Sequence, residues 1–226
     1  MVEQGYSQDE RAAVYRTIRE RRDVRSGFMP QPLEDELLLR LLRAGHQAPS
    51  VGLMQPWQFV LVRDANVRRR VHDIFAEAKQ QAGTIYIGDK SEKYQDLKLA
   101  GILEAPQNLC VVCDSQAARG YGLGRQTMPE TPAYSAVCAI QNLWLAARAE
   151  GVGVGWVSIL HPEAVKEALG IPAGLDLIAY LCIGYVDHFR PAPELEERGW
   201  EKRIPLEDVL HLDSFGQRSW QKAEAR

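Results

Sequence analysis

The sequence has few cysteines, and their positions argue against both disulfides and a zinc site. Only four cysteines occur in 226 residues, too few for a disulfide framework in a chain of this length. Cys110 and Cys113 have the C-x-x-C spacing but lie in a short apolar run that is typical of a strand. A strand would direct the two side chains to opposite faces. The sequence contains no second C-x-x-C pair, so we expect buried, reduced thiols and no metal.

Long hydrophobic runs and an excess of positive charge are also absent from the sequence. No stretch approaches the ~18 apolar residues of a membrane-spanning helix. The N-terminal residues 1–10 lack the apolar core of a signal peptide. Lysine and arginine number 27 against 30 acidic residues, which gives a net charge of −3. This balance offers no electrostatic basis for binding nucleic acid or an anionic membrane, and we expect a cytoplasmic protein with neither partner.

The length and the residue pattern favour one α+β domain over residues 1–226. The chain of 226 residues is about one and a half times a typical domain of roughly 150 residues, and no linker separates two cores. Helices precede and interrupt the strands without a regular βαβ alternation, which argues against a doubly wound sheet. We expect helices over 8–21, 37–45, 66–81, 133–150 and 162–170, and strands over 58–63, 109–113, 152–159 and 175–185.

Two further segments are polar or extended. Residues 83–105 contain three lysines and two tyrosines, and their composition predicts a mobile segment rather than core. After residue 187 the chain is rich in proline and charge, too extended to hold a core of its own. A tail of this kind usually packs around another part of the protein or another chain, and a partner subunit is the natural candidate.

The first segment with chemical potential is Arg21-Arg22-Asp23-Val24-Arg25. If a helix continued through it, Arg21 and Arg25 would lie four residues apart on one face; if the helix ended, the arginines would fan out. Either way, planar guanidinium groups suit bidentate binding of a phosphate. The alternative is a solvated helix end, where cations complement the helix dipole.

The second and third segments could both border a flat ligand. In Ala48–Trp57, Ser50 and the backbone near Gly52 offer hydrogen bonds to a heterocycle, and Gln55 can pair with a mixed donor and acceptor edge. In Gly153–Ser158, two glycines let a backbone approach a ligand closely, Trp156 adds an aromatic wall, and Ser158 adds a hydroxyl at the strand's end. A structural turn and a plain core strand are the respective alternatives.

Together these segments resemble the FMN-dependent nitroreductase superfamily. Arg21–Arg25, Ala48–Trp57 and Gly153–Trp156 are followed by a late Lys-Arg-x-Pro at Lys202–Pro205, and the ordered set covers nearly the whole chain. The resemblance implies a central sheet that is mixed but mostly antiparallel, flanked by helices. It also implies a homodimer with two FMN sites at the subunit interface and swapped terminal arms, the C-terminal one over 187–226.

The resemblance also assigns particular residues to FMN. Arg21, Arg22 and Arg25 would contact its phosphate, ribityl chain and pyrimidine edge, and Arg203 would reach the phosphate. Residues 83–105 would close over the reduced ring as a lid. The implied FMN contacts are Arg21, Arg22, Asp23, Val24, Arg25, Ser50, Met54, Gln55, Gly155, Trp156, Ser158 and Arg203.

Within the superfamily, the chain is most similar to a branch that consumes reduced FMN. Asp23 stands where nitro-reducing members commonly carry a serine or similar small polar residue, and Leu53 replaces a common asparagine. The segments ending at Ser158 and Arg203 are also similar to that branch. The resemblance implies that oxygen and FMNH2, which a separate flavin reductase could supply, give 5,6-dimethylbenzimidazole, the lower ligand of vitamin B12, with release of erythrose 4-phosphate. FMN is then a substrate, O2 the co-substrate, and no metal is required.

This chemistry needs proton removal near the ribityl hydroxyls, and Asp23 and Ser158 are the candidate catalytic residues. Nearby arginines favour the ionised Asp23 carboxylate, which could act as base or proton shuttle, and Ser158 would orient the flavin by hydrogen bonding. The alternative for Asp23 is a simple ion pair with Arg22 or Arg25. Two rival functions remain open: an NAD(P)H-dependent nitroreductase or dehalogenase that retains its flavin, and a flavin carrier or sensor, which would leave Asp23 and Ser158 unexplained.

Overall fold

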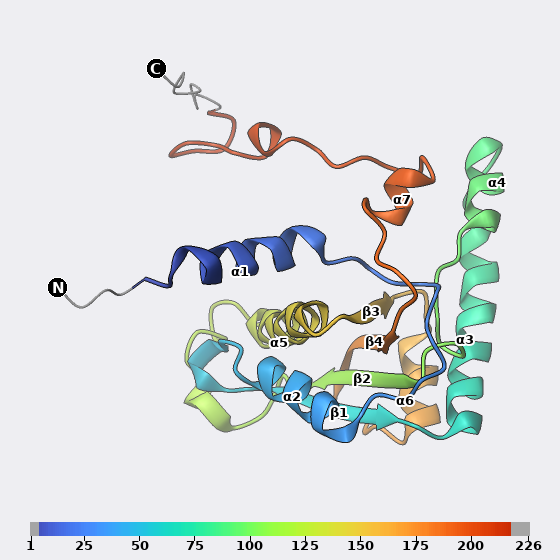
Figure 1. Cartoon of the computed structure of the whole chain (residues 1–226). Helices are drawn as coiled ribbons and strands as arrows, with labels where there is room; N and C mark the ends of the chain where they lie inside the picture. Colours follow the sequence, from blue (N-terminus) through green and yellow to red (C-terminus); the bar gives the residue numbers. More distant parts are fainter. Residues whose placement is uncertain (1–4, 218–226) are drawn as a thin grey trace, which may run out of the picture. The chain divides into compact units, whose positions relative to one another are not determined.

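The computed structural model describes residues 5–217, in a large unit that runs through Pro191 and a small C-terminal unit that begins at Ala192. The large unit is built on a four-stranded sheet of strand order β1-β2-β4-β3. All three neighbouring pairs are antiparallel, and Figure 1 shows the opposite directions of β1 and β2. The strands are β1 (Trp57–Val62), β2 (Gln107–Cys113), β3 (Val152–Val157) and β4 (Asp176–Tyr185). These bounds and the α+β class confirm the sequence-based expectation.

Six helices belong to the large unit, among the residues that the structure describes. Five had been expected, with ends within about three residues of those observed, because their apolar side chains recur at helical spacing. The sixth, α4, was missed because its sequence is almost entirely polar. The helices are α1 (Gln8–Glu20), α2 (Asp35–His46), α3 (Ala65–Gly83), α4 (Asp89–Asp96), α5 (Thr131–Ala149) and α6 (Pro162–Leu169).

Each face of the sheet carries its own hydrophobic core. Helices α2 and α5 pack on one face, and α3 and α6 contribute to the core on the other (Figure 1). The strands alternate between the two cores, since Cys113 lies in the first and Cys110 in the second. The expectation that these two thiols point to opposite faces is therefore confirmed, and the four cysteines are free.

Helix α1 differs from the others because none of its residues is buried. Its start is fixed by a reciprocal capping box, in which the Ser7 and Glu10 side chains each accept from the other residue's backbone N–H. Val14, Tyr15 and Ile18 nevertheless give it an exposed apolar stripe at helical spacing. This stripe is not covered within the described chain.

The expectation that residues 83–105 are mobile rather than core is wrong for the second half of this segment. After α4 the chain is irregular, with a turn at residues 102–104, and its apolar side chains enter the second core. The error arose because these residues have no regular period and stand among lysines. The buried residues are Tyr94, Leu97, Ala100, Ile102 and Ala105. The lid role stays a prediction, best confined to the exposed residues before Tyr94.

The C-terminal unit contains one short helix, α7 (Glu194–Glu197), and a single 3₁₀ turn at Leu206–Asp208 among its described residues. This small amount of regular secondary structure agrees with the expected lack of a core. The role of residues 187–226 as a swapped arm stays a prediction. Residues 218–226 lie outside the described part of the chain. The single domain over 1–226 also stays a prediction, because the two units are described separately.

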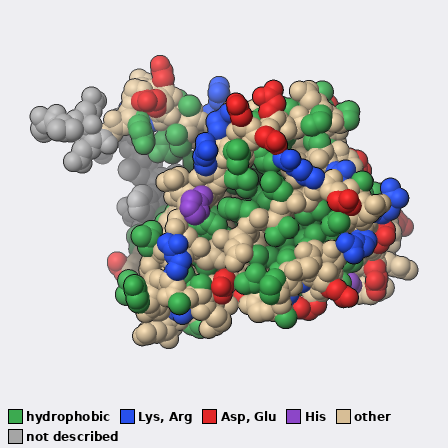
Figure 2. Space-filling model, turned by 90° about the horizontal axis from the view of Figure 1, so that it is seen from below, with side chains coloured by type: hydrophobic (Ala, Val, Ile, Leu, Met, Phe, Trp, Pro, Cys, Tyr) green, Lys and Arg blue, Asp and Glu red, His purple; other side chains and the backbone are tan. Residues whose placement is uncertain are grey.

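The surface carries both signs of charge. On the face shown in Figure 2, hydrophobic side chains gather in the middle, and acidic and basic side chains are interspersed around them. Among residues 5–217, no helix is both long and apolar enough to cross a bilayer. The same residues contain no group of three or more histidine, cysteine or acidic side chains placed to hold a metal ion.

Candidate functional site

The arginine-rich segment begins where α1 ends. The Arg21 N–H donates to the Thr17 carbonyl oxygen at 3.0 Å and closes the last helical turn, but Arg21 itself has an extended backbone (φ −60°, ψ 135°). The chain then continues in extended form. Of the two arrangements left open by the sequence, the structure therefore has the one in which the arginines fan out rather than share a helix face.

Asp23 and Val24 pair with the free edge of β3. The Val24 N–H donates to the Val154 carbonyl oxygen at 3.0 Å, and the Trp156 N–H donates to Asp23 Oδ1 at 2.9 Å. Asp23 and Val154 form an isolated parallel bridge. This short parallel pairing makes the otherwise antiparallel sheet a mixed one, and it joins two of the three segments singled out in the sequence.

Both glycines of Gly153-x-Gly155 are required by the chain's own packing. A Cβ on Gly155 would lie 1.9 Å from the Val24 carbonyl oxygen, and one on Gly153 would lie 2.5 Å from Val186 Cγ1. The sequence alone suggests that these glycines leave room for a flat ligand. In the structure, the close approach is made by residues 24 and 186 instead, so the interpretation based on ligand approach is not needed to explain them.

Asp23 forms its ion pair with Arg25 and not with Arg22. Arg25 Nε and Nη2 donate to Asp23 Oδ2 at 3.0 and 2.7 Å. The side chains are 15% and 28% exposed, so the pair is held at the edge of the unit and remains accessible from solvent. With the Trp156 N–H on Oδ1, the carboxylate accepts three hydrogen bonds, which fix its orientation.

Arg22 is committed to backbone carbonyls. Its Nη1 donates to the carbonyl oxygens of Arg19 and Arg21, each at 2.8 Å, and its Nη2 donates to that of Pro191. Its buried Nε has no hydrogen-bond partner. The side chain thereby ties the end of α1 to the end of the large unit, and contact with FMN through its terminal nitrogens would require these bonds to be exchanged.

Sequence reasoning missed Trp144, which lies on α5 beside this segment. Its Nε1 donates to the Arg22 carbonyl oxygen at 3.1 Å, and the Arg21 guanidinium carbon lies 4.6 Å from the centre of its ring. The signal was hidden because α5 is apolar nearly all round, and nothing in that pattern separates Trp144 from ordinary core residues.

Ser50, Met54 and Gln55 form a second group, at the start of α5. The Ser50 hydroxyl accepts from the Gln55 N–H at 3.0 Å, and the Val51 N–H donates to Ser135 Oγ at 3.1 Å. Met54 is only 2% exposed, so its side chain packs inside the unit. A hollow of about 900 Å³ opens beside this group, lined by Gly52, Leu53, Ala118, Arg119, Gly120, Tyr121, Leu123, Gly124 and Gln126.

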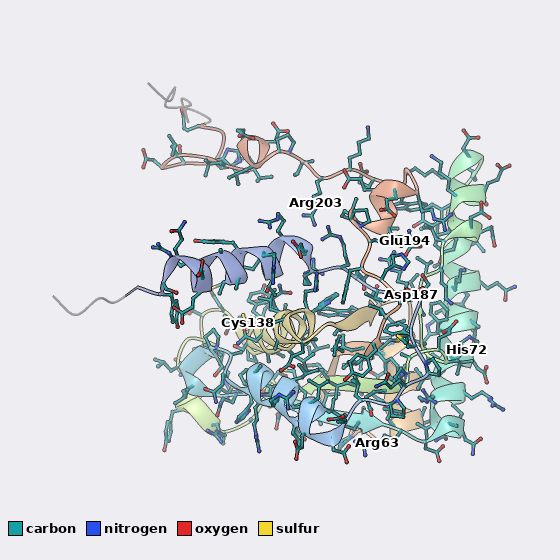
Figure 3. The ribbon with its side chains drawn as sticks, in the orientation of Figure 1. Arg63, His72, Cys138, Asp187, Glu194 and Arg203 are labelled. Atoms are coloured by element: carbon teal, nitrogen blue, oxygen red, sulfur yellow. The ribbon has the colours of Figure 1, made fainter. Side chains whose placement is uncertain are left out.

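The large unit does not bring the two groups together. Ser135 and Trp144, their respective neighbours on α5, are nine residues apart, or roughly 14 Å along a helix axis. Ser158 is exposed one residue beyond the end of β3, two residues from Trp156. Arg203 is exposed in the C-terminal unit, on an extended stretch (Figure 3).

The candidate residues near α1 carry a moderate net positive charge. Arg21, Arg22 and Arg25 set against Asp23 leave a formal charge of 3 − 1 = +2. Cys110 and Cys113 are unsuited to act as nucleophiles, because burial raises the pKa of the Cys110 thiol to about 12 and that of the Cys113 thiol to about 11. The chemistry of the site therefore rests on arginine, carboxylate, backbone and hydroxyl groups.

This fold and motif set belong to a known class. The model of the nitroreductase family matches residues 18–185, and the chain is a member of that family. Among curated relatives, 5,6-dimethylbenzimidazole synthase of Rhodospirillum rubrum is 48% identical over 82% of this chain and 87% of its own length. The synthase of Rhodobacter capsulatus is 41% identical over 89% of this chain and 97% of its own. The expected superfamily and its branch are thus confirmed.

Solved structures show the same fold at lower sequence identity. Oxidised iodotyrosine deiodinase, solved with FMN and 3-iodo-L-tyrosine, has a TM-score of 0.68 at 22% identity, over 85% of this chain and 97% of its own. NADPH:FMN oxidoreductase from Vibrio harveyi, solved with NAD⁺, has a TM-score of 0.65 at 22% identity, over 91% of this chain and 79% of its own. These likenesses support the fold.

Proposed function

We propose that this protein forms 5,6-dimethylbenzimidazole from reduced FMN and oxygen, with release of erythrose 4-phosphate. The observation that carries the proposal is the agreement of two relatives, at 48% and 41% identity over most of the chain, in the name 5,6-dimethylbenzimidazole synthase. In this reaction FMN is the substrate and O2 the co-substrate. No metal takes part.

The residues around the end of α1 complement the charge of FMN. Its phosphate is a dianion near neutral pH, and the net charge of +2 from Arg21, Arg22, Arg25 and Asp23 complements it. The half-buried Arg21 and Arg25 offer guanidinium donors, and the partly exposed Trp156 side chain offers an aromatic surface. Arg203, from the C-terminal unit, is proposed as a further phosphate ligand.

Asp23 is proposed as the group that accepts a proton at a ribityl hydroxyl. Its carboxylate is held by three donors from Arg25 and Trp156 yet keeps 28% of its side chain exposed, so it is both oriented and reachable. Ser158, two residues after Trp156, is proposed to donate a hydrogen bond to the flavin and to orient it relative to Asp23. The reduced, oxygen-reactive ring comes from FMNH2 itself.

A homodimer is proposed because one chain holds only part of the site. The Ser50, Met54 and Gln55 group lies at another level of α5 than the Asp23 group, so a second copy would supply it across a two-fold axis. The exposed apolar stripe of α1 also supports a dimer, because a second copy would cover Tyr15 and Val14, which are 67% and 53% exposed. On α5, Tyr134, Val137 and Cys138 are also exposed; Figure 3 labels Cys138 beside this helix.

The test is a single-turnover reaction of the purified protein with chemically reduced FMN in air, followed by mass spectrometry. We expect a mass for 5,6-dimethylbenzimidazole in amounts that scale with protein, with or without NADPH. A flavin reductase plus NADPH should replace the chemical reductant. Intact FMN together with rapid NADPH oxidation by this protein alone would overturn the proposal in favour of a flavin-retaining reductase.

A further inference from the structure

We infer that Trp144 is a positioning residue that holds Arg21 ready for the phosphate of FMN. The inference rests on the proposed function, because it concerns the same phosphate. Trp144 is 7% exposed and lies on α5, outside each of the segments that resemble the family's motifs. Its role follows from what its ring and its N–H touch.

Trp144 makes two different contacts, one through its ring and one through its indole nitrogen. The Arg21 guanidinium lies over the Trp144 ring at 4.6 Å, within the range of a cation–π contact. The Trp144 N–H donates to the carbonyl oxygen of Arg22 at 3.1 Å. One side chain therefore fixes the guanidinium of one residue and the backbone of the next.

A second contact joins Trp144 to the Asp23 side of the site. Its ring centre lies 6.4 Å from that of Trp156, at an angle of 45°. The backbone N–H of Trp156 is the one that donates to Asp23 Oδ1. Trp144 thus links Arg21, Arg22 and Trp156, and through Trp156 it is connected to Asp23.

The same face of α5 also fixes the last turn of α1. Arg148, one helical turn after Trp144, donates from Nε to the Glu20 carbonyl oxygen at 3.2 Å and from Nη2 to the Glu20 carboxylate at 3.0 Å. The carbonyl groups at the end of a helix otherwise lack partners. The direction in which the chain leaves α1, and so the starting point of Arg21, is set from α5.

These contacts matter for binding because a free arginine side chain has many rotamers. Stacking on Trp144 restricts Arg21 before the ligand arrives, so less conformational entropy is lost on binding. Leucine at position 144 would fill space but would offer neither an aromatic face nor an N–H. Phenylalanine would keep a face and lose only the hydrogen bond.

The experiment compares FMN with riboflavin, which lacks the phosphate, on full-length protein. For Trp144→Leu we expect FMN affinity to fall about tenfold and riboflavin affinity to stay within about twofold. Trp144→Phe should retain most of the FMN preference. Arg21→Met should abolish that preference, and Trp144→Leu should add little to it in the double variant.

The outcomes separate the inference from the proposed function. Equal weakening of both ligands by Trp144→Leu, or an unchanged FMN preference in Trp144→Leu or Arg21→Met, would overturn the inference. If Trp144→Leu fails to fold, Trp144→Met takes its place, since methionine also lacks an aromatic face and an N–H. Loss of the FMN preference in Trp144→Met supports the inference, and an unchanged preference overturns it. Formation of the benzimidazole by the wild-type protein tests the proposed function independently of every variant.

Discussion

The carbonyl oxygen of Val24 occupies the space beside Gly155 that a side chain would need, 1.9 Å from an ideal Cβ. The contact exists because residues 23 and 24 pair with the edge of β3. Asp23 can reach the backbone N–H of Trp156 only because residue 155 is a glycine. The glycine therefore controls the geometry of the candidate site through the packing of the backbone.

Gly155→Ala should destabilise the protein, because the new methyl group must displace rigid backbone. Overpacking of this kind costs about 1–3 kcal/mol in the free energy of unfolding, which urea denaturation measures. Gly174→Ala is the matched control, since a Cβ there meets nothing within 4 Å. Equal stability of the two variants would contradict the account of Gly155.

Asp23→Asn should keep FMNH2 binding and lose product formation. The asparagine oxygen can still accept from the Trp156 N–H, but it cannot take up a proton as the carboxylate can. We expect the turnover number to fall by about 10²–10⁴. Anaerobic titration with FMNH2 checks binding, and the benzimidazole is measured by mass spectrometry. Unchanged turnover would remove Asp23 from the mechanism and leave it as the ion-pair partner of Arg25.

Val137→Glu should convert the proposed dimer into a monomer with weakened FMN binding. Val137 is 41% exposed on α5, and a buried charge at a subunit interface is costly when it has no partner. Sedimentation gives the mass, and a thiol reagent should label the neighbouring Cys138 faster in the variant. Leu39→Glu, at a 49% exposed position on α2, is the control that should leave the mass unchanged. A monomeric wild-type protein that still binds FMN tightly would rule out a composite site.

The stability of the protein should fall as the pH rises above 9. Burial raises the pKa of the Cys110 thiol from 9.0 to about 12, so the unfolded chain releases this proton over a range in which the folded chain keeps it. The free energy of unfolding should decline by about 1.4 kcal/mol per pH unit for this thiol between pH 9 and 12. Urea denaturation at a series of pH values should show a shallower decline for Cys110→Ala. Equal slopes for the two proteins would contradict this account of Cys110.

Local patterns predicted most of the elements. Helix and strand periods are properties of neighbouring residues, so the four strands and five of the helices could be located from the sequence. Helix α4 was not predicted, because its polar sequence has no apolar side chains at a helical period. The sequence did not predict the burial of Ile102 and Ala105 for a related reason, because an irregular segment is buried by packing against other elements and has no period of its own.

The sequence by itself determined the family, the α+β class and the arginine segment, because ordered motifs and periodic side chains are written along the chain. Only the tertiary structure decided which groups each side chain meets. Asp23 receives the Trp156 N–H from 133 positions away, and Arg22 receives the Trp144 N–H from 122. Contacts between residues so distant in sequence depend on how helices pack on a sheet, and that packing is set by the whole core rather than by any one segment.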